Sequence, residues 1–483
     1  MAFSKAPSQS TYQTKEIKSA WVLRNRDASG TKDTIALNGF YDLVTNKATG
    51  DKDIHFVKRD GCSAFEYTLP SGPARGAFYW EEQDKLFVSY GDDIAVITGS
   101  TGVLVTTLSN VFLSTTGEVG FCEFLYDTGS TKIVVTDGTR IVTIDSANVV
   151  VTGASVDQPA AFNPHVVFLD GYLFLAKTNT AEIYNSNLND PLAYTSGDFI
   201  SAEMVADNLI RIVRLNNYIL ALGTASIEFF YDAAVETASP LKRVDTPVKN
   251  VGYLGGAVTH QNRMYFVGQT QSTSPEVFMI EDWKLETLDN PPLRRYVQPH
   301  TSFNGAIVTN GGRDFYVLTV GSITYWMDLD TRLWTRVAFQ NSATFALQAA
   351  MIVPRPTIGN VSVVIPTTGT SLYVFNPNLY QDAGVNYNVE VQTYKNMFDT
   401  YHEKYMSRLL VIADQANAGN VSLSWTDDDY QSFSPVRTID LSERKPRIHR
   451  MGRFVERAFK FTYTTNNPLK LHHFEVDFNI GNR

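Results

Sequence analysis

The chain has 483 residues, of which 43% are hydrophobic and 12% aromatic, a composition typical of a globular protein and not of a disordered one. Its formal net charge of −9 argues against a protein whose main task is to hold nucleic acid through the phosphates. The only cysteines, Cys62 and Cys122, exclude a disulfide framework or a cysteine-based zinc site and fit synthesis in a reducing cytoplasm.

The first region, residues 1–70, is rich in Lys, Asp, Thr and Gly. Its start is polar and lacks the apolar segment of a secretory signal, and no apolar stretch in the chain is long enough to span a bilayer. Short strand-like pieces occur at 35–37 and 64–67. We therefore expect an arm, or a partial domain that completes the C-terminal domain.

A degenerate unit then recurs about seven times, in which a polar turn precedes a β-branched or aromatic strand and a second turn and strand follow. One strand position per copy marks the repeat: Leu86, Ile133, Leu173, Ile219, Met264, Phe315 and Val363. Successive positions are 40 to 51 residues apart. A repeat of this length built from short strands is typical of β-propeller blades.

The strands of the repeat are apolar on both faces, as in residues 172–176, where Leu173 and Leu175 alternate with Tyr172, Phe174 and Ala176. Two apolar faces suit a blade packed between two neighbours. A single β-sandwich also has recurring turns, but seven similar units exceed what one sandwich needs. We predict an all-β fold with a propeller of six or seven blades over residues 71–380.

The last region, residues 381–483, changes character. Strands are expected at 387–393, 407–413, 421–426 and 458–463, without the blade spacing. This pattern predicts a small β-sandwich, a platform domain packed against the propeller.

No catalytic motif is found: the chain has no nucleophile elbow, phosphate-binding loop, zinc-protease helix or dinucleotide fingerprint. His473 and Glu475 would share a strand face, but two ligands fall short of a metal site. Residues 424–433 resemble the Asp-box hairpin of sialidase propellers, with Tyr430 where that pattern has Gly. We interpret Asp427, Asp428 and Asp429 as a structural turn and expect no enzymatic activity, cofactor or metal.

The C-terminal region also contains a basic cluster in a chain that is otherwise acidic. Apolar residues interleave with it, so one side can pack while the other meets an acidic partner or phosphates. A solvated face is the alternative. The candidate interface residues are Arg444, Lys445, Arg447, Arg450, Arg453, Arg457 and Lys460.

An ordered set of motifs resembles the tail hub, or nozzle, proteins of short-tailed bacteriophages, also called packaged-DNA stabilisation proteins. None of the motifs is catalytic, and the resemblance depends on their order. The motifs are Ala225-Ser226-Ile227-Glu228-Phe229-Phe230, Ser407-Arg408-Leu409-Leu410, Ser422-Leu423-Ser424-Trp425-Thr426-Asp427, Arg450-Met451-Gly452-Arg453, Arg457-Ala458-Phe459-Lys460-Phe461 and Asn467-Pro468-Leu469-Lys470-Leu471.

The resemblance implies a virion protein of the phage tail, made in the bacterial host cytoplasm. It implies a homo-hexameric ring below the portal and the tail adaptor (head-to-tail connector) proteins, through which DNA passes without sequence-specific binding. It also implies docking of a tail needle or plug and of tailspikes or tail fibres. Two alternatives stay open: a glycan-binding or glycan-cleaving propeller, and a scaffold of the Kelch or WD type, whose motif only residues 330–334 suggest.

Overall fold

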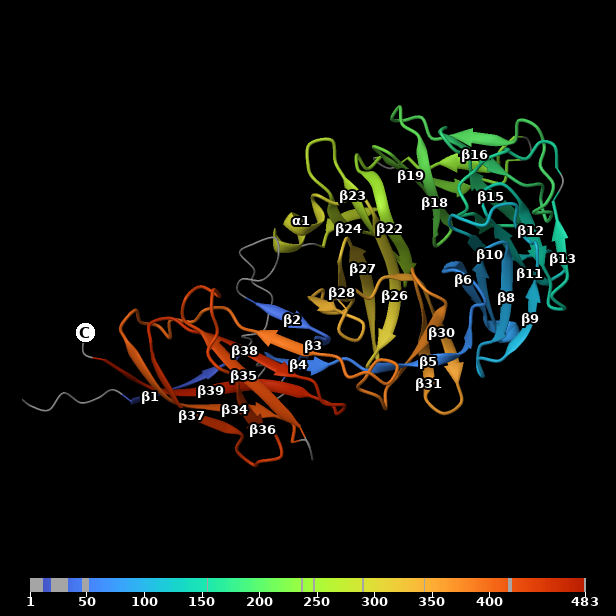
Figure 1. The fold of residues 1–483 in the computed structure, drawn as a ribbon. Coiled ribbons are helices and arrows are strands. Elements are labelled where there is room, and N and C mark those ends of the chain that lie inside the picture. The colour runs from blue at the N-terminus through green and yellow to red at the C-terminus, as the bar shows by residue number, and fades with distance from the viewer. Residues whose placement is uncertain are drawn as a thin grey trace, which may run out of the picture. The chain divides into compact units, whose positions relative to one another are not determined.

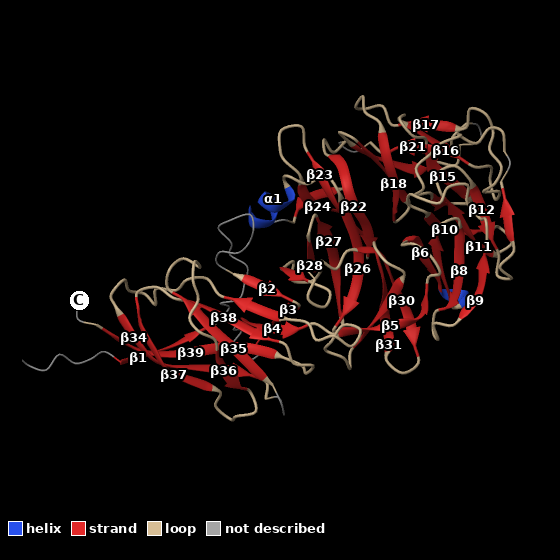
Figure 2. Ribbon diagram, viewed as in Figure 1, coloured by secondary structure: helices blue, strands red, loops and turns tan. Residues whose placement is uncertain are grey.

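The computed structural model describes residues 12–18, 34–45, 52–153, 155–235, 238–245, 248–288, 291–342, 344–415 and 419–481. In this part of the chain nearly all regular structure is β-strand, and the helices are the short α1 (Pro291–Val297) and the 3-10 turn η1 (Glu81–Gln83) (Figure 2). The chain forms two units, and no helix among these residues is long and apolar enough to cross a membrane. Unit 1 comprises residues 1–62, 323–344 and 377–483, and unit 2 comprises residues 63–322 and 345–376.

Unit 2 is built from antiparallel four-stranded sheets that follow one another along the chain (Figure 1). The first three are β6 (Ala74–Trp80), β7 (Lys85–Tyr90), β8 (Asp93–Thr98) and β9 (Leu104–Leu108); β10 (Gly120–Leu125), β11 (Thr131–Thr136), β12 (Ile141–Ile144) and β13 (Val150–Thr152); and β14 (Val167–Leu169), β15 (Tyr172–Ala176), β16 (Glu182–Asn185) and β17 (Phe199–Ser201). The next two are β18 (Leu209–Leu215), β19 (Tyr218–Gly223), β20 (Ile227–Asp232) and β21 (Leu241–Arg243); and β22 (Gly252–His260), β23 (Arg263–Gln269), β24 (Glu276–Glu281) and β25 (Lys284–Thr287).

Two further elements complete unit 2. The hairpin of β26 (Phe303–Asn310) and β27 (Arg313–Val320) precedes a sheet of β30 (Leu347–Arg355), β31 (Gly359–Pro366), β32 (Ser371–Asn376) and β5 (Gly61–Thr68). The strand β5 comes from far earlier in the sequence, so the last sheet is completed by a segment near the N-terminus. Such a closure ties the two ends of the propeller together and covers an outer sheet edge.

The first strands of these elements form a closed ring. Each contacts the next, and β30 contacts β6 again, in the order β6, β10, β14, β18, β22, β26 and β30. Unit 2 is therefore a propeller with seven sectors among the described residues. The prediction of an all-β propeller is confirmed.

All seven repeat positions found in the sequence lie on the second strand of their sector: β7, β11, β15, β19, β23, β27 and β31. Their side chains are at most 1% exposed. Neighbouring residues of one strand serve opposite interfaces, since Leu86 packs in a cluster with Val363 while Phe87 packs in a cluster with Ile133. Burial of each such side chain stabilises the fold by about 1.5–3 kcal/mol, which explains why the repeat is apolar on both faces.

Unit 1 contains two groups of paired strands. The first has the order β3 (Gly39–Thr45), β4 (Lys52–Lys58), β39 (Lys470–Ile480), β34 (Lys404–Ala413) and β37 (Arg447–Phe454), and β1 (Tyr12–Ile17) also pairs with β39. The second has the order β28 (Ile323–Asp328), β29 (Trp334–Val337), β2 (Ile35–Leu37), β33 (Val389–Gln392), β38 (Ala458–Tyr463), β35 (Asn420–Thr426) and β36 (Arg437–Asp440). A shared apolar core combines residues of both groups.

One segment of the range expected for the propeller belongs to unit 1. Residues 323–344 join unit 1 although they fall inside the range 71–380, and residues 12–17, 35–37 and 56–57 pair with C-terminal strands. Residues 323–344 belong to unit 1 because Leu37 in β2 forms a parallel bridge to Arg336 in β29. Such a pairing between distant segments leaves no local signal in the sequence.

Candidate functional site

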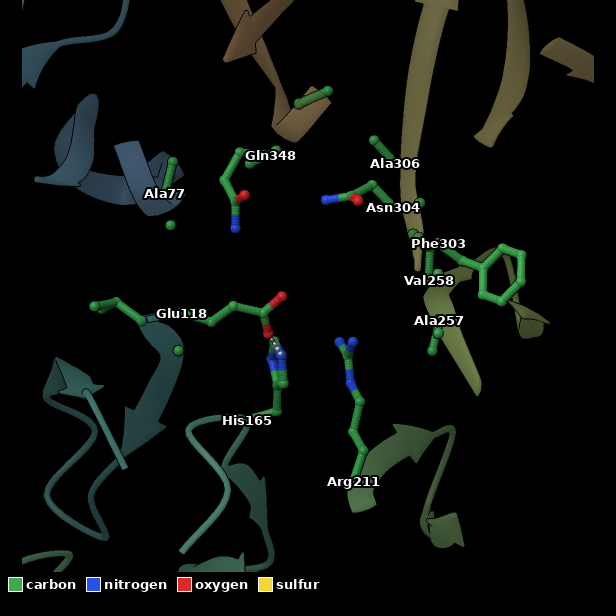
Figure 3. A pocket seen from close by; sticks show the side chains of 18 of the residues that line it. Ala77, Glu118, His165, Arg211, Ala257, Val258, Phe303, Asn304, Ala306 and Gln348 are labelled. Carbon is green, nitrogen blue, oxygen red and sulfur yellow. Dashed lines mark hydrogen bonds and ion pairs between the residues drawn. The ribbon is translucent and has the colours of Figure 1, made fainter. Parts of the chain in front are cut away.

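The ring of inner strands in unit 2 encloses a central cavity of about 680 Å³. Its wall carries Glu118, His165 and Arg211, and the side chains of Asn304 and Gln348 point toward the same open space (Figure 3). Glu118 and His165 precede β10 and β14, and Arg211 lies in β18, so each comes from a successive sector.

The carboxylate of Glu118 and the imidazole of His165 form a hydrogen bond, with 2.8 Å between Oε2 and Nε2. This bond lowers the pKa of Glu118. Burial in the cavity wall, followed by the nearby positive charge of Arg211, lowers the pKa of His165. A neutral imidazole at pH 7 therefore donates its Nε2–H to the carboxylate.

Arg211 has a weaker set of contacts. Its Nη1 is 3.5 Å from the hydroxyl of Tyr253, at the outer limit of a hydrogen bond, and its buried Nε has no partner among the described residues. The guanidinium is thus available to an acceptor inside the cavity. The arrangement can bind a ligand, and its lining includes the hydroxyl residues Thr301 and Ser302.

The sequence motifs did not reveal this cavity, although the spacing of its polar residues resembles that of the apolar repeat. Glu118, His165 and Arg211 are 47 and 46 residues apart, within the spacing of the apolar repeat itself. Their positions relative to the repeat residues Ile133, Leu173 and Ile219 differ, being 15, 8 and 8 residues earlier in the chain. Alignment of polar residues on the repeat would therefore have grouped His165 with Arg211, whereas the place of Glu118 depends on the tertiary structure.

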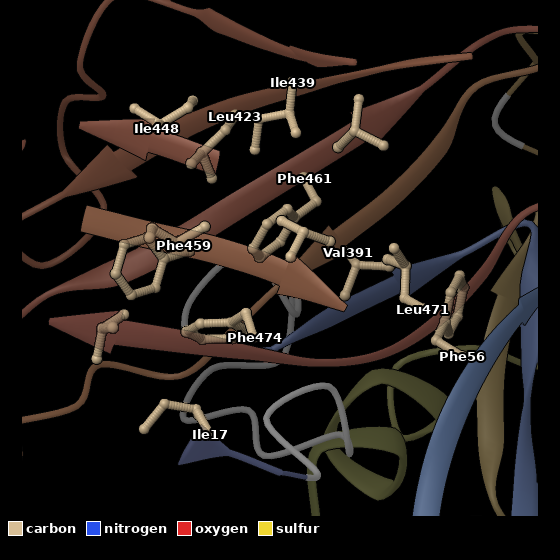
Figure 4. Packing of buried hydrophobic residues seen from close by; sticks show 14 of the residues in the cluster. Ile17, Phe56, Val391, Leu423, Ile439, Ile448, Phe459, Phe461, Leu471 and Phe474 are labelled. Atoms are coloured by element: carbon tan, nitrogen blue, oxygen red, sulfur yellow. The ribbon is translucent and has the colours of Figure 1, made fainter. Parts of the chain in front are cut away.

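The predicted interface cluster lies in unit 1, mainly on β37, the last strand of its sheet. The apolar residues Ile448, Met451 and Phe454 are buried in the core of unit 1, where Figure 4 shows Ile448 beside Leu423 and Ile439. The basic residues between them are exposed. Arg450 occupies a register shift between β34 and β37 and has a φ of 61°, which turns its side chain outward next to that of His449.

Five basic residues of the cluster are exposed, and we call this set the basic edge: Arg444, Lys445, Arg447, Arg450 and Arg453. Within the described residues, only Arg453 has an ion-pair partner, the exposed Glu403 at 3.4 Å. Exposed pairs of this kind contribute at most about 1 kcal/mol. The basic edge is therefore available for contact with another molecule.

The other two members of the cluster are held inside unit 1. Arg457 is 1% exposed, donates two hydrogen bonds of 2.8 Å to the carboxylate of Asp427, and lies over the ring of Phe454 at 4.4 Å. Lys460 is half-buried with Glu390 at 2.8 Å. Their positive charges are compensated within the chain, so the surface open to a partner is the basic edge alone.

The Asp427–Asp429 segment forms a tight hairpin. Asp427 holds Arg457, while Asp428 accepts hydrogen bonds from the hydroxyl of Thr426 and from the backbone N–H of Ser432. These bonds and one from the Ser432 hydroxyl lower the pKa of Asp428 to about 2. The three carboxylates act on protein groups, which fits the structural interpretation of this turn.

The histidines near the C-terminus pair with separate carboxylates. His472 contacts Asp414 at 2.8 Å and stacks on His55, whereas His473 contacts Glu16 at 3.0 Å. The described residues contain no group of three or more potential ligands arranged around a metal position.

Comparisons with solved structures find matches of low sequence identity. A streptogramin B lyase has 11% identity and a TM-score of 0.45, and the match covers 66% of this chain and 98% of that chain. The virginiamycin B lyase from Staphylococcus aureus has 10% identity and a TM-score of 0.40, covering 70% and 98%. The N-terminal domain of Nup159 has 10% identity and a TM-score of 0.42, covering 71% and 99%. No functional conclusion follows from these likenesses.

No curated protein matches the sequence. A family model does match, that of the phage stabilisation family with the description "Bacteriophage P22 Gp10, beta-propeller", over residues 43–301. This range covers just over half of the chain and includes the repeats from Leu86 to Met264. The chain therefore belongs to the phage stabilisation family of bacteriophage P22 Gp10, and it is a phage structural protein that stabilises packaged DNA.

Proposed function

We propose that copies of this chain form the tail nozzle of a short-tailed phage. In this proposal a ring of six subunits extends the DNA channel below the portal and the adaptor, retains the packaged genome, and releases it at ejection. The ring also carries the tail needle and the tailspikes or fibres, and it performs no catalysis. The observation that carries the proposal is the family match over residues 43–301, and the ordered motifs of the C-terminal region support it.

The basic edge is the surface that we propose for contact with a neighbouring subunit or the adaptor. Its strand β37 is the last of its sheet, and its exposed side chains include Arg447, Arg450 and Arg453 of the basic edge. Its guanidinium groups suit bidentate contact with carboxylates, which are plentiful on a chain of net charge −9. Loss of one partner from a desolvated pair costs about 3–5 kcal/mol, and a ring repeats each loss in every subunit.

The test is an assembly assay with the variant Arg447→Glu/Arg453→Glu. Both residues occupy regular register positions opposite Leu410 and Tyr405, so the exchange leaves the register shift at Arg450 intact. We expect folded subunits that no longer join tail-less heads, which then lose their DNA. The measurements are attachment by cryo-electron microscopy and the infectivity of the completed particles.

A matched control reverses two charges elsewhere. Lys242 and Lys284 are exposed on the outer strands β21 and β25 of the propeller, and Lys242→Glu/Lys284→Glu changes the net charge by the same amount. We expect this variant to attach normally. Normal attachment of the basic-edge variant would contradict the proposed interface, and a ring with a number of subunits other than six would contradict the nozzle proposal.

A second candidate function, a glycan-binding propeller, has one observation in its favour. The central cavity of unit 2 is polar and holds a guanidinium group with an unused N–H. This observation concerns a binding site and does not conflict with a structural role in the tail.

A further inference from the structure

The central cavity of unit 2 has the size and the lining of a small-molecule site. Its volume of about 680 Å³ lies within the range of small-ligand pockets, roughly 300–1,000 Å³. Glycines of the inner strands, among them Gly76, Gly120 and Gly305, form part of the wall and allow neighbouring strands to approach closely. The functional groups that point inward come from separate sectors, so the closed ring positions them rigidly.

The charge balance of the wall leaves one positive group without a partner. Glu118 has its hydrogen bond with His165, and no ion pair joins Glu118 to Arg211 among the described residues. Arg75, the other arginine of the lining, donates hydrogen bonds to the backbone carbonyls of Gly91, Ser114, Thr116 and Gly117. Arg211 alone therefore offers its guanidinium to the cavity.

The buried Nε of Arg211 has no acceptor among the described residues, so the guanidinium is incompletely hydrogen-bonded within the chain. More than nine in ten buried polar groups have a hydrogen-bond partner, and a charged donor without one is costly. A carboxylate in the cavity would accept from the terminal N–H groups of the Arg211 guanidinium, in the bidentate geometry that arginine favours. The negative charge of Glu118 on the same wall disfavours a dianion such as phosphate, so a monoanion fits the site best.

The side-chain amides of Asn304 and Gln348 indicate which groups the ligand carries besides its carboxylate. The Asn304 side chain has no hydrogen-bond partner among the described residues, and Gln348 uses one N–H for the carbonyl of Arg75 at 3.3 Å, which leaves its oxygen. Figure 3 shows both amides facing the space between Glu118 and Arg211. Free amide donors and acceptors suit hydroxyl groups, which can donate and accept at once.

We propose that this cavity binds a small hydroxylated carboxylate of the uronic acid class. Arg211 contacts the carboxylate, and Asn304 and Gln348 contact hydroxyl groups. The contact requires no covalent step and no cofactor. The inference does not depend on the nozzle proposal, because it concerns the propeller centre and not the basic edge.

The test is isothermal titration of the full-length protein with glucuronate, and with glucose as a probe that lacks the carboxylate. We expect glucuronate to bind with a Kd of about 1 mM and glucose to bind at least about tenfold more weakly. Arg211→Gln should weaken glucuronate binding by about tenfold or more, because it removes the charged donor. The control Arg214→Gln changes an exposed arginine of the same strand, which donates to the carbonyl of Phe168, and should leave the affinity unchanged.

Four results would overturn the inference: no glucuronate binding by the unchanged protein, equal binding by Arg211→Gln, glucose binding as tight as that of glucuronate, or tighter binding of inorganic phosphate. A thermal unfolding curve of each variant establishes that it is folded. If Arg211→Gln fails to fold, Asn304→Ala takes its place, with a loss of affinity for glucuronate as the expected result and an unchanged affinity as the contrary one.

Discussion

At the scale of single residues, unit 1 contains a buried charge cluster that spans three distant segments. Arg59 and Asp382 are both fully buried and form a bidentate ion pair, and Arg59 also donates to the side chain of Asn38 and the carbonyl of Ala338. A buried charge is stable only beside its counter-charge, so removal of either Arg59 or Asp382 would leave the other uncompensated. The cluster connects residues 38, 59, 338 and 382 without any local sequence signal.

Lys58, next to this pair, has no carboxylate partner among the described residues. Its Nζ donates to the carbonyl of Thr465 at 2.7 Å and lies 4.5 Å from the ring centre of Tyr387 and 5.3 Å from that of Tyr463. Burial, followed by repulsion from Arg59, lowers the pKa of Lys58 to about 7, and the charge of Asp382 opposes this only in part.

The lowered pKa of Lys58 predicts a pH dependence of stability. Between about pH 7 and the pKa near 10.4 of an unfolded lysine, the unfolded chain binds more protons, so stability rises with pH across this window. We expect the free energy of unfolding to gain up to about 2 kcal/mol from pH 7 to pH 9, and Lys58→Met to remove most of this gain. Urea unfolding at both pH values measures it.

The control for Lys58 is Lys445→Met, which changes an exposed lysine of the same unit. It should alter stability by less than about 0.5 kcal/mol at either pH. If the unchanged protein and Lys58→Met show the same pH dependence, the lysine is not the group responsible.

At the scale of elements, the inner strands of the propeller approach one another closely enough to require glycine. A Cβ built on Gly120 of β10 would lie 1.8 Å from the carbonyl oxygen of Pro164, and one on Gly252 of β22 would lie 1.9 Å from that of Thr224. Both obstacles are backbone atoms of the adjoining sector, which can move only if the ring opens. The glycines therefore set the spacing between neighbouring blades at the centre.

This spacing gives a prediction for Gly120→Ala. The added methyl group should destabilise unit 2 by about 3 kcal/mol, because neither backbone can yield without displacing its sheet. Gly153→Ala is the control, since its methyl group would first meet the flexible end of Leu192 at 3.3 Å, and it should cost less than about 1 kcal/mol. Thermal unfolding compares the two, and equal midpoints would show that the ring tolerates the extra atom.

At the scale of the whole molecule, the net charge of −9 disfavours a tight interaction with duplex DNA. An acidic chain repels phosphates over a Debye length of about 8 Å at physiological salt, which in our nozzle proposal lets DNA slide along the channel. The basic edge is too small to reverse this balance, and in our proposal it faces protein carboxylates.

We therefore predict no stable complex between the purified chain and duplex DNA. Electrophoretic mobility of a labelled duplex at about 0.15 M salt should be unchanged by protein at about 10 µM, a concentration at which many non-specific DNA-binding proteins bind. The Arg447→Glu/Arg453→Glu variant should behave in the same way. A complex whose affinity falls steeply with salt, and which this variant loses, would assign the basic edge to DNA instead of protein.

The sequence by itself determined the class of fold and the family. Seven apolar strands with a spacing of 40 to 51 residues identify blades because each of these strands packs against a neighbouring sheet on both faces. Successive residues such as Leu86 and Phe87 are therefore both apolar, and this pattern is visible in the sequence. The exposed basic character of Arg447 and Arg453 was readable for the same reason, since alternation along a strand separates buried from exposed side chains.

Only the tertiary structure decided which residues meet across the chain. The closure of the last blade by β5, the pairing of Arg457 with Asp427 and the convergence of Glu118, His165 and Arg211 all join segments that are 30 to some 300 residues apart. Such contacts depend on the closure of the ring and on the register of distant strands, which no periodicity within one strand encodes. The register of distant strands also places Arg457 beside Asp427 in an internal ion pair, although its neighbours in the basic cluster are exposed.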